Sequence, residues 1–125
     1  MATNRKIRIT VGLLCLTAEL DGSRTAEAIL RALPIEASGN RWGDEVYFSI
    51  PVVAKAENAK EVVAVGDLAY WPPGRAFCIF FGPTPASRGN EIRPASPVNV
   101  IGKVLGDATL LRQMCDGEPV KIELA

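Results

Sequence analysis

Apolar and polar residues alternate over several short stretches of this chain. Residues 6–11 alternate strictly, and Val46, Phe48 and Ile50 share one face of the stretch 44–50. Side chains of a β-strand point alternately to its two faces, so this pattern predicts half-buried strands. On the same grounds we expect strands over 6–20 (two strands, or one bent at Gly12), 44–50, 67–71, 98–105 and 120–124.

The stretch from Ala76 to Phe81 differs from these strands because it is apolar at every position. Pro72-Pro73-Gly74 precedes it and Gly82-Pro83 follows it, and both segments favour turns. A short uninterrupted apolar run between two turns is typical of a central strand that is covered on both faces.

Two short helices are also expected. Ser23 is a suitable N-cap for the first, and Pro34 ends it. Its apolar residues recur at helical spacing and form one stripe: Ala26, Ile29, Leu30 and Leu33. The second helix follows Gly106-Asp107 and ends at Gly117, and its apolar residues are Leu110, Leu111 and Met114.

The remaining segments are predicted to be connections. We expect a turn at Ser38-Gly39-Asn40, and a polar surface loop or short helical turn over 54–61. Seven of the nine prolines lie between Pro51 and Pro97, which makes residues 82–97 mostly irregular. Within that segment, 91–93 is the one candidate strand.

These elements define a fold class. Many short strands with two short helices and no alternation of strands with helices favour an antiparallel closed barrel or a sandwich. A chain of 125 residues is long enough to bury a hydrophobic core and fits one domain, 1–125, without a linker or an internal repeat.

Composition excludes several classes of function. Fourteen basic and fourteen acidic residues leave no surplus of positive charge to neutralise phosphates, so we expect no nucleic-acid partner. Histidine is absent, which removes the commonest general base and the commonest zinc ligand. No apolar stretch is long enough to span a membrane.

The three cysteines point to a reducing compartment. Cys15, Cys78 and Cys115 lie far apart, form no closely spaced pair and sit within apolar runs. We therefore expect reduced thiols in the core of a cytoplasmic protein, without a metal site. A basic start followed by an apolar stretch resembles a secretion signal, but the strict alternation over 6–11 favours a strand.

Two longer blocks carry a resemblance to a known family. They are GDLAYWPPGRAFCIFFGPTP over residues 66–85 and EIRPASPVNVIGKV over residues 91–104. With the opening strand, the helix ending at Leu33-Pro34 and the segment WGDEVYF at 42–48, they resemble the small prokaryotic cyclophilin-like proteins, a family without an established activity. The resemblance covers nearly the whole chain and implies a closed eight-stranded antiparallel barrel, mainly β, with a short helix at either end.

The resemblance also bears on chemistry. Cyclophilins that isomerise prolyl bonds carry an F-H-R-I-I-P segment whose arginine acts on the bond, followed by a phenylalanine and a glutamine. The matching stretch here is Tyr47-Phe48-Ser49-Ile50-Pro51, without arginine or histidine, and residues 62–65 hold no glutamine. This loss of the electrostatic group favours a non-catalytic binding module for an extended peptide or a small apolar ligand. A weak or atypical prolyl isomerase is the alternative.

The candidate binding residues follow from the same comparison. The strand at 79–81 matches the aromatic strand that lines the pocket of cyclophilins, so Phe80 and Phe81 are candidates for its apolar wall. Trp71, beside two prolines, is a candidate rim residue, although a plug at the end of the barrel is the more ordinary role. For Trp42 we favour core packing.

Charged candidates complete the set. Arg75 is either a solvated turn residue or an anchor for a carboxylate. Glu91 and Arg93 would form a local ion pair or a polar rim around the pocket, and Asp67 would accept N–H bonds in a turn. No catalytic residue, cofactor or metal is expected, and self-association stays open.

Overall fold

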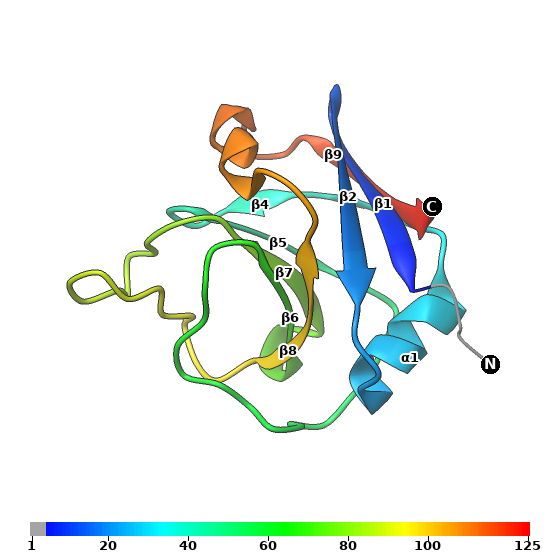
Figure 1. The fold of residues 1–125 in the computed structure, drawn as a ribbon, viewed down its shortest axis with the longest axis horizontal. Helices are drawn as coiled ribbons and strands as arrows, with labels where there is room; N and C mark the ends of the chain where they lie inside the picture. Colours follow the sequence, from blue (N-terminus) through cyan, green and yellow to red (C-terminus); the bar gives the residue numbers. More distant parts are fainter. Residues whose placement is uncertain (1–4) are drawn as a thin grey trace.

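The computed structural model describes residues 5–125, so residues 1–4 of the expected single domain lie outside the described residues. The described chain forms one nine-stranded sheet that curls into a nearly closed barrel, with its strands in the order β3-β9-β1-β2-β8-β6-β7-β5-β4 (Figure 1). The strands are β1 (Lys6–Val11), β2 (Leu14–Leu20), β3 (Ile35–Ser38), β4 (Asn40–Arg41), β5 (Glu45–Ser49), β6 (Asp67–Trp71), β7 (Ala76–Phe80), β8 (Asn99–Val104) and β9 (Pro119–Leu124).

The mainly β, antiparallel barrel is confirmed, with nine described strands in place of eight. The extra strand arises at Gly39, which separates β3 from β4, and those two strands form the two edges of the sheet. Gly39 N–H donates to the carbonyl of Glu118, and its own carbonyl accepts from Gly117 N–H. The expected turn at 38–40 is therefore wrong. The chain stays extended there, and Gly39 is packed so closely that a Cβ would lie 2.6 Å from Met114 Cε.

Helices lie at opposite ends of the barrel, as expected (Figure 1). The α-helix α1 (Arg24–Ala32) is capped by Ser23, whose hydroxyl accepts from Ala26 N–H. The second helix is shorter than the pattern predicted and is a 3-10 helix, η2 (Ala108–Gln113), capped by Asp107. A third helical turn, η1 (Pro72–Gly74), occupies the predicted turn between β6 and β7.

The barrel interior is filled by side chains. Phe48 from β5 and Phe77 from β7 stack there with ring centroids 5.4 Å apart, beside Leu68, Tyr70 and other aliphatic side chains. The outward side chains of β7 are also buried, in a second cluster on the outside of the sheet. The prediction that β7 is covered on both faces is thus confirmed, and every one of its residues is buried.

Two long connections cover the outer face of β5, β7 and β6. They are the segments 50–66 and 82–98, and they hold each other through two isolated bridges, Lys60 with Val98 and Val63 with Ile92. The candidate strand at 91–93 is reduced to the second of these bridges. Apolar side chains of both connections, including Val63, Ile92 and Val98, pack on the outer face and complete the second cluster.

The first connection is not a purely solvated loop. The Glu57 carboxylate accepts from the N–H groups of Arg24 and Thr25 and from the Thr25 hydroxyl at 2.7 Å, so it binds the N-terminus of α1. Buried Asn99 accepts from Glu57 N–H at 2.7 Å and donates to the Lys55 carbonyl and the Thr25 hydroxyl. These bonds tie the connection, the helix and β8 together.

The expectation of three core thiols is wrong for two of them. Cys78 is buried in β7, whereas Cys15 and Cys115 are exposed. Cys15 lies on the outward face of β2, because alternate residues of a strand point away from the barrel interior. Among residues 5–125, no helix has the length and apolar character needed to cross a membrane.

Asn99 supplies a test of how firmly the first connection is attached. Asn99 is buried, and replacing it by alanine leaves the partly buried Glu57 N–H, the Lys55 carbonyl and the Thr25 hydroxyl without their partner. We expect Asn99→Ala to lower the free energy of unfolding by about 2–3 kcal/mol, measured by urea denaturation. The matched variant Asn90→Ala, at an exposed loop position, should change it by less than about 0.5 kcal/mol. Equal effects of the two variants would contradict the role assigned to Asn99.

Candidate functional site

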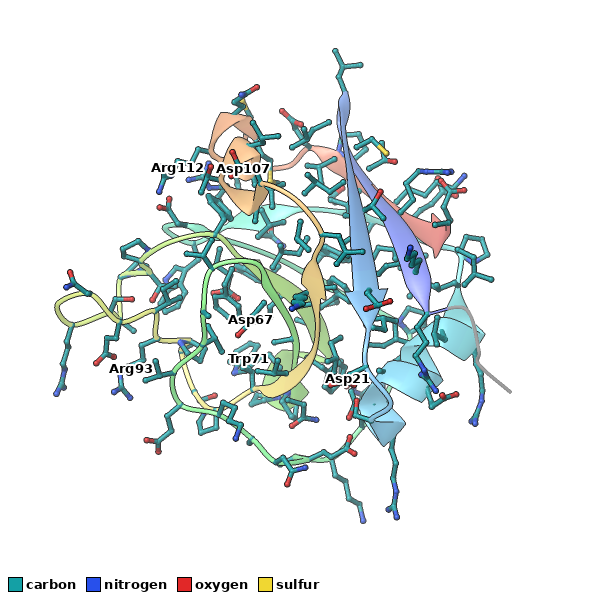
Figure 2. All side chains as sticks on the ribbon, viewed as in Figure 1. Asp21, Asp67, Trp71, Arg93, Asp107 and Arg112 are labelled. Atoms are coloured by element: carbon teal, nitrogen blue, oxygen red, sulfur yellow. The ribbon has the colours of Figure 1, made fainter. Side chains whose placement is uncertain are left out.

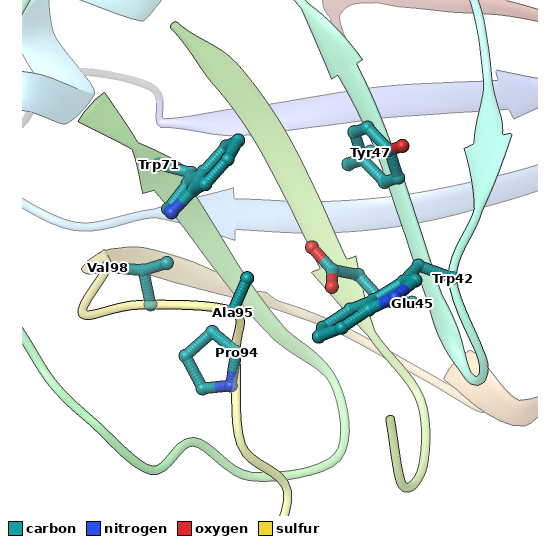
Figure 3. A pocket seen from close by; sticks show the side chains of 7 residues that line it. All are labelled: Trp42, Glu45, Tyr47, Trp71, Pro94, Ala95 and Val98. Atoms are coloured by element: carbon teal, nitrogen blue, oxygen red, sulfur yellow. The ribbon is translucent and has the colours of Figure 1, made fainter. Parts of the chain in front are cut away.

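A pocket of about 240 Å³ lies on the outer face of the sheet, between the strands and the segment 94–98 (Figure 3). For scale, an apolar cavity of about 150 Å³ accommodates a benzene molecule. The pocket is walled mainly by aromatic and aliphatic side chains and contains one carboxylate; its lining residues are Trp42, Glu45, Tyr47, Trp71, Pro94, Ala95 and Val98.

The hollow follows from the sizes of the side chains along three strands. Tyr47 of β5 pairs with Cys78 of β7, which pairs with Ala69 of β6, so two small residues occupy the middle of this face. Larger side chains stand at the ends of the strands, with Trp71 at one end and Glu45 at the other. Small residues between large ones leave a depression that the covering segment closes from outside.

Trp71 is held in a fixed orientation at its end of the pocket. Its indole N–H donates to the Ser96 hydroxyl at 2.6 Å, which joins the ring to the covering segment. Gly74, in the η1 turn, packs against the other part of the ring: a Cβ at this position would lie 2.6 Å from two ring carbons of Trp71. The absence of a side chain at residue 74 therefore allows the indole to lie where it does.

Trp42 reaches the pocket from the turn between β4 and β5. The backbone N–H of Trp42 donates to the Glu45 carbonyl. The backbone N–H of Asp44 donates to the carbonyl of Pro83, which fixes the turn against the start of the second connection. Arg41 holds the other side of this turn: its guanidinium donates to the carbonyls of Gly43 and Met114. The turn is thus bonded to the second connection through Pro83 and to the segment after η2 through Met114.

Glu45 is the charged residue of this pocket. The residue is only 5% exposed, and Figure 3 shows its carboxylate near the middle of the lining side chains. Burial raises the pKa of Glu45 from its ordinary value of 4.5 to about 7, and a hydrogen bond from the Cys78 thiol offsets only part of that rise. Burial likewise raises the pKa of Cys78 well above its ordinary value of 9.0. Near neutral pH this carboxyl group therefore exists in both protonation states.

The covering wall is fixed on both sides of the pocket. Lys60 and Val98 exchange two backbone hydrogen bonds, of 2.7 and 3.0 Å, and Val63 N–H donates to the Ile92 carbonyl. With the bond between Trp71 and Ser96, these contacts hold the segment 92–98 at three points. The pocket is consequently formed before any ligand enters.

The aromatic candidates Phe80 and Phe81 are both fully buried and do not line the pocket. Phe80 pairs with Glu45 across β5 and β7 and packs in the outer cluster. Phe81 belongs to the interior cluster, and the Arg41 guanidinium carbon lies 5.1 Å from the centre of its ring. Of the predicted aromatic residues, the structure brings Trp71 alone to the wall of this pocket.

None of the charged candidates is among the residues that line the pocket. Arg75 is exposed in the turn after η1, with φ of 48°. Its backbone N–H donates to the Pro72 carbonyl, and its carbonyl accepts from Ile50 N–H. Arg93, labelled in Figure 2, lies on the second connection. It forms an ion pair with Glu91, which is the ordinary role considered for both residues. Asp67 accepts from Ala64 N–H at 2.9 Å, as expected for a turn carboxylate.

Sequence reasoning missed three lining residues on or next to β5. From the sequence we favour core packing for Trp42, and we assign no function to Glu45 and Tyr47 within the predicted strand 44–50. The sequence of the partner strand β7 contained a signal for Glu45. Because β7 is apolar on both faces, a layer must cover its outer face, and that layer also covers a glutamate on the neighbouring strand. Among residues 5–125, no three cysteine, aspartate or glutamate side chains gather in an arrangement that could hold a metal ion.

The raised pKa of Glu45 makes stability depend on pH in a defined direction. The unfolded chain loses this proton near pH 4.5 and the folded protein near pH 7, so the folded state binds one more proton between these values. Stability contributed by the neutral form is therefore lost as pH rises through this window, by about 3 kcal/mol in all. We expect Glu45→Gln to remove this component, measured as the difference in unfolding free energy from the unsubstituted protein at a series of pH values.

Glu36→Gln is the matched control, because Glu36 is exposed on β3. Its unfolding free energy should follow that of the unsubstituted protein across the same window. Parallel pH profiles for the protein and Glu45→Gln would contradict the assignment of a neutral, buried carboxyl group.

Comparison with known proteins places this chain and its fold in a family. A model of the Cyclophilin-like family matches residues 5–123. The solution structure of the hypothetical protein AF2241 from Archaeoglobus fulgidus is similar over the whole chain: the TM-score is 0.84, the sequence identity is 44%, and the match covers 100% of this chain and 98% of that one. A search of curated proteins found no match. The family model spans nearly every described residue, and the archaeal protein shares the fold at 44% sequence identity. The chain therefore belongs to the cyclophilin-like family.

Proposed function

We propose that this protein is a non-catalytic binding module whose aromatic pocket takes a small apolar ligand or one apolar residue of an extended peptide. One observation carries the proposal: Trp42, Tyr47 and Trp71 wall a preformed cavity of about 240 Å³. Concave, mostly apolar sites with few polar groups are the usual form of ligand pockets in proteins. Ligand binding removes the exposed aromatic surface from water, which is favourable.

The alternative, prolyl isomerisation, needs a fixed donor that stabilises the twisted imide bond. The residues lining the pocket include no arginine, and the candidates Arg75 and Arg93 lie in an exposed turn and in an ion pair with Glu91. No observation favours the isomerase over the binding module. A protease-coupled assay with a peptide of the Ala-Pro-Phe type should accordingly give the uncatalysed rate, and an acceleration that Trp71→Phe abolishes would overturn the non-catalytic assignment.

Binding can be followed with the protein's own fluorescence. The chain has two tryptophans, and both line the pocket, so a ligand that enters should change the emission directly. We expect the neutral alcohol 3,3-dimethyl-1-butanol, or a short proline-containing peptide, to shift the emission saturably. The same titration followed by amide chemical shifts should move Trp42, Tyr47, Trp71 and Ala95.

Variants at two exposed alanines provide the matched comparison. Ala95→Phe places a ring at the mouth of the pocket, whereas Ala59→Phe places one on the first connection. Ala95→Phe should weaken binding by about tenfold or more, equal to about 1.4 kcal/mol, and Ala59→Phe should leave it unchanged. Absence of binding by both probes, or equal effects of the two variants, would contradict the proposed function.

Gly74 tests whether the position of Trp71 shapes the pocket. A methyl group at residue 74 would lie 2.6 Å from the Trp71 ring, so Gly74→Ala must move the indole or the turn. We expect a loss of about 1–3 kcal/mol in stability, a change in tryptophan emission and weaker ligand binding.

Gly22→Ala is the control for this substitution, because a Cβ there meets nothing within 4 Å. It should preserve the emission spectrum and the affinity. An unchanged emission spectrum in Gly74→Ala would show that the Trp71 ring does not depend on this contact.

A further inference from the structure

The aromatic pocket contains a feature that an apolar binding site does not require. Glu45 is a carboxylate that is only 5% exposed, and it is directed into the cavity among Trp42, Tyr47 and Trp71. Its carboxylate oxygens have one side-chain partner, the thiol of Cys78, which is a weak donor. A buried charged group normally has an ionic partner or several hydrogen bonds, because desolvation is otherwise unfavourable.

Among residues 5–125, none of the side chains that line the pocket with Glu45 is a cation, and its pKa is set by burial and the Cys78 thiol alone. Arg93, on the covering segment, is paired with Glu91. The titratable groups that face it are Cys78 from β7 and Tyr47 from β5 itself. On the outward face of β6, Ala69 and Trp71 carry no charge, and the Asp67 carboxylate at the start of the strand accepts from Ala64 N–H. The lining residues of the covering segment, Pro94, Ala95 and Val98, are uncharged as well. The Arg41 guanidinium is bound to carbonyl groups and to the Asp44 carboxylate, and it lies over Phe81, which belongs to the interior cluster.

Aromatic rings beside a carboxylate form an arrangement with a specific chemical preference. The faces of tryptophan and tyrosine rings are electron-rich and attract cations, most strongly those that carry apolar substituents and little bound water. A positive nitrogen near the ring faces could also form the ionic contact that Glu45 lacks. A neutral apolar ligand would fill the same space but would leave the carboxylate without a partner.

We propose that the ligand of this pocket carries an alkylammonium group, which is a positive nitrogen with apolar substituents. The group pairs with Glu45 between Trp42 and Trp71, and this inference rests on the proposed function. The cavity of about 240 Å³ has room for such a head group and a short attached chain. The group can belong to a free small molecule or to an N-methylated lysine of a peptide, and both present the same chemistry.

Protonation of Glu45 supplies a signature of this pairing. The ionised carboxylate binds the cation, and burial raises the pKa of Glu45 to about 7, so affinity should rise with pH through neutrality and level off above about pH 8. Below neutrality the affinity should fall by up to about tenfold per pH unit. A neutral ligand that accepts a hydrogen bond from the protonated carboxyl group would show the opposite trend.

The experiment compares two molecules of the same shape. Choline carries a trimethylammonium group, and 3,3-dimethyl-1-butanol has a carbon in place of its nitrogen. Both are titrated into the 125-residue protein at constant ionic strength from about pH 5 to about pH 9, with tryptophan emission as the readout. We expect choline to bind at least about tenfold more tightly than the alcohol at high pH and to lose this preference at low pH.

Substitution of Glu45 separates the charge from the shape of the pocket. Glu45→Gln should reduce the choline affinity by about tenfold or more, make it independent of pH and remove the preference for choline over the neutral alcohol. Glu36→Gln, at an exposed site, should behave as the unsubstituted protein. A peptide with one trimethyllysine, compared with its unmethylated form, distinguishes a modified side chain from a free small molecule as the source of the cation.

The outcomes distinguish this inference from the proposed function. Equal affinity of choline and the alcohol, or a choline affinity that Glu45→Gln leaves unchanged, would overturn the alkylammonium assignment while the pocket still binds apolar ligands. Failure of choline, the alcohol and the peptides to change the emission would overturn both. Tighter binding of choline, lost in Glu45→Gln and at low pH, would support both.

Discussion

The burial of β7 on both faces is the constraint on which the rest of this structure depends. Every side chain of β7 is withdrawn from water: Phe77 and Ile79 point into the barrel, and Ala76, Cys78 and Phe80 point toward the outside. A barrel by itself covers only the inner half. The outer half needs a second layer, and in this protein two irregular connections provide it through Val63, Ile92 and Val98. The pocket exists because this layer crosses the small side chains Ala69 and Cys78 without filling the space above them.

The same layer determines the chemistry of Glu45. On an open sheet its position opposite Phe80 would leave a glutamate in contact with water. Covered by the segment 94–98 and by Trp42, its carboxyl group is removed from water, and the raised pKa is the electrostatic consequence. A single packing arrangement therefore produces an aromatic cavity and a carboxyl group that titrates near neutrality. Perturbed titratable groups in pockets are more often functional than those on open surfaces.

Local patterns predicted the elements well because the determining interactions are local. Alternation along 6–11 and 44–50, the cap at Ser23 and the turn at Pro72–Gly74 each depend on neighbouring residues, and the structure contains all four. The predicted turn at Gly39 failed for the opposite reason. Glycine is compatible with a turn and with a close packing contact, and the sequence does not distinguish the two. Here the glycine is required by its contact with Met114, which is distant in the chain. The candidate site was predicted in part: Trp71 lines the pocket, while Phe80 and Phe81 are enclosed in the two cores.

The sequence by itself determined the strands other than β3 and β4, the barrel class and the family resemblance, because alternation, turn residues and matching blocks are properties of the chain. The lack of a cyclophilin-like arginine in the segment 47–51 is likewise visible in the sequence alone. Only the tertiary structure decided which aromatic side chains face the cavity and that Glu45 stands among them. Those facts depend on how the segments 50–66 and 82–98 fold over the sheet, through Lys60 with Val98 and Trp71 with Ser96. Such contacts join residues far apart in sequence, and irregular connections carry no periodic signal from which their path could be read.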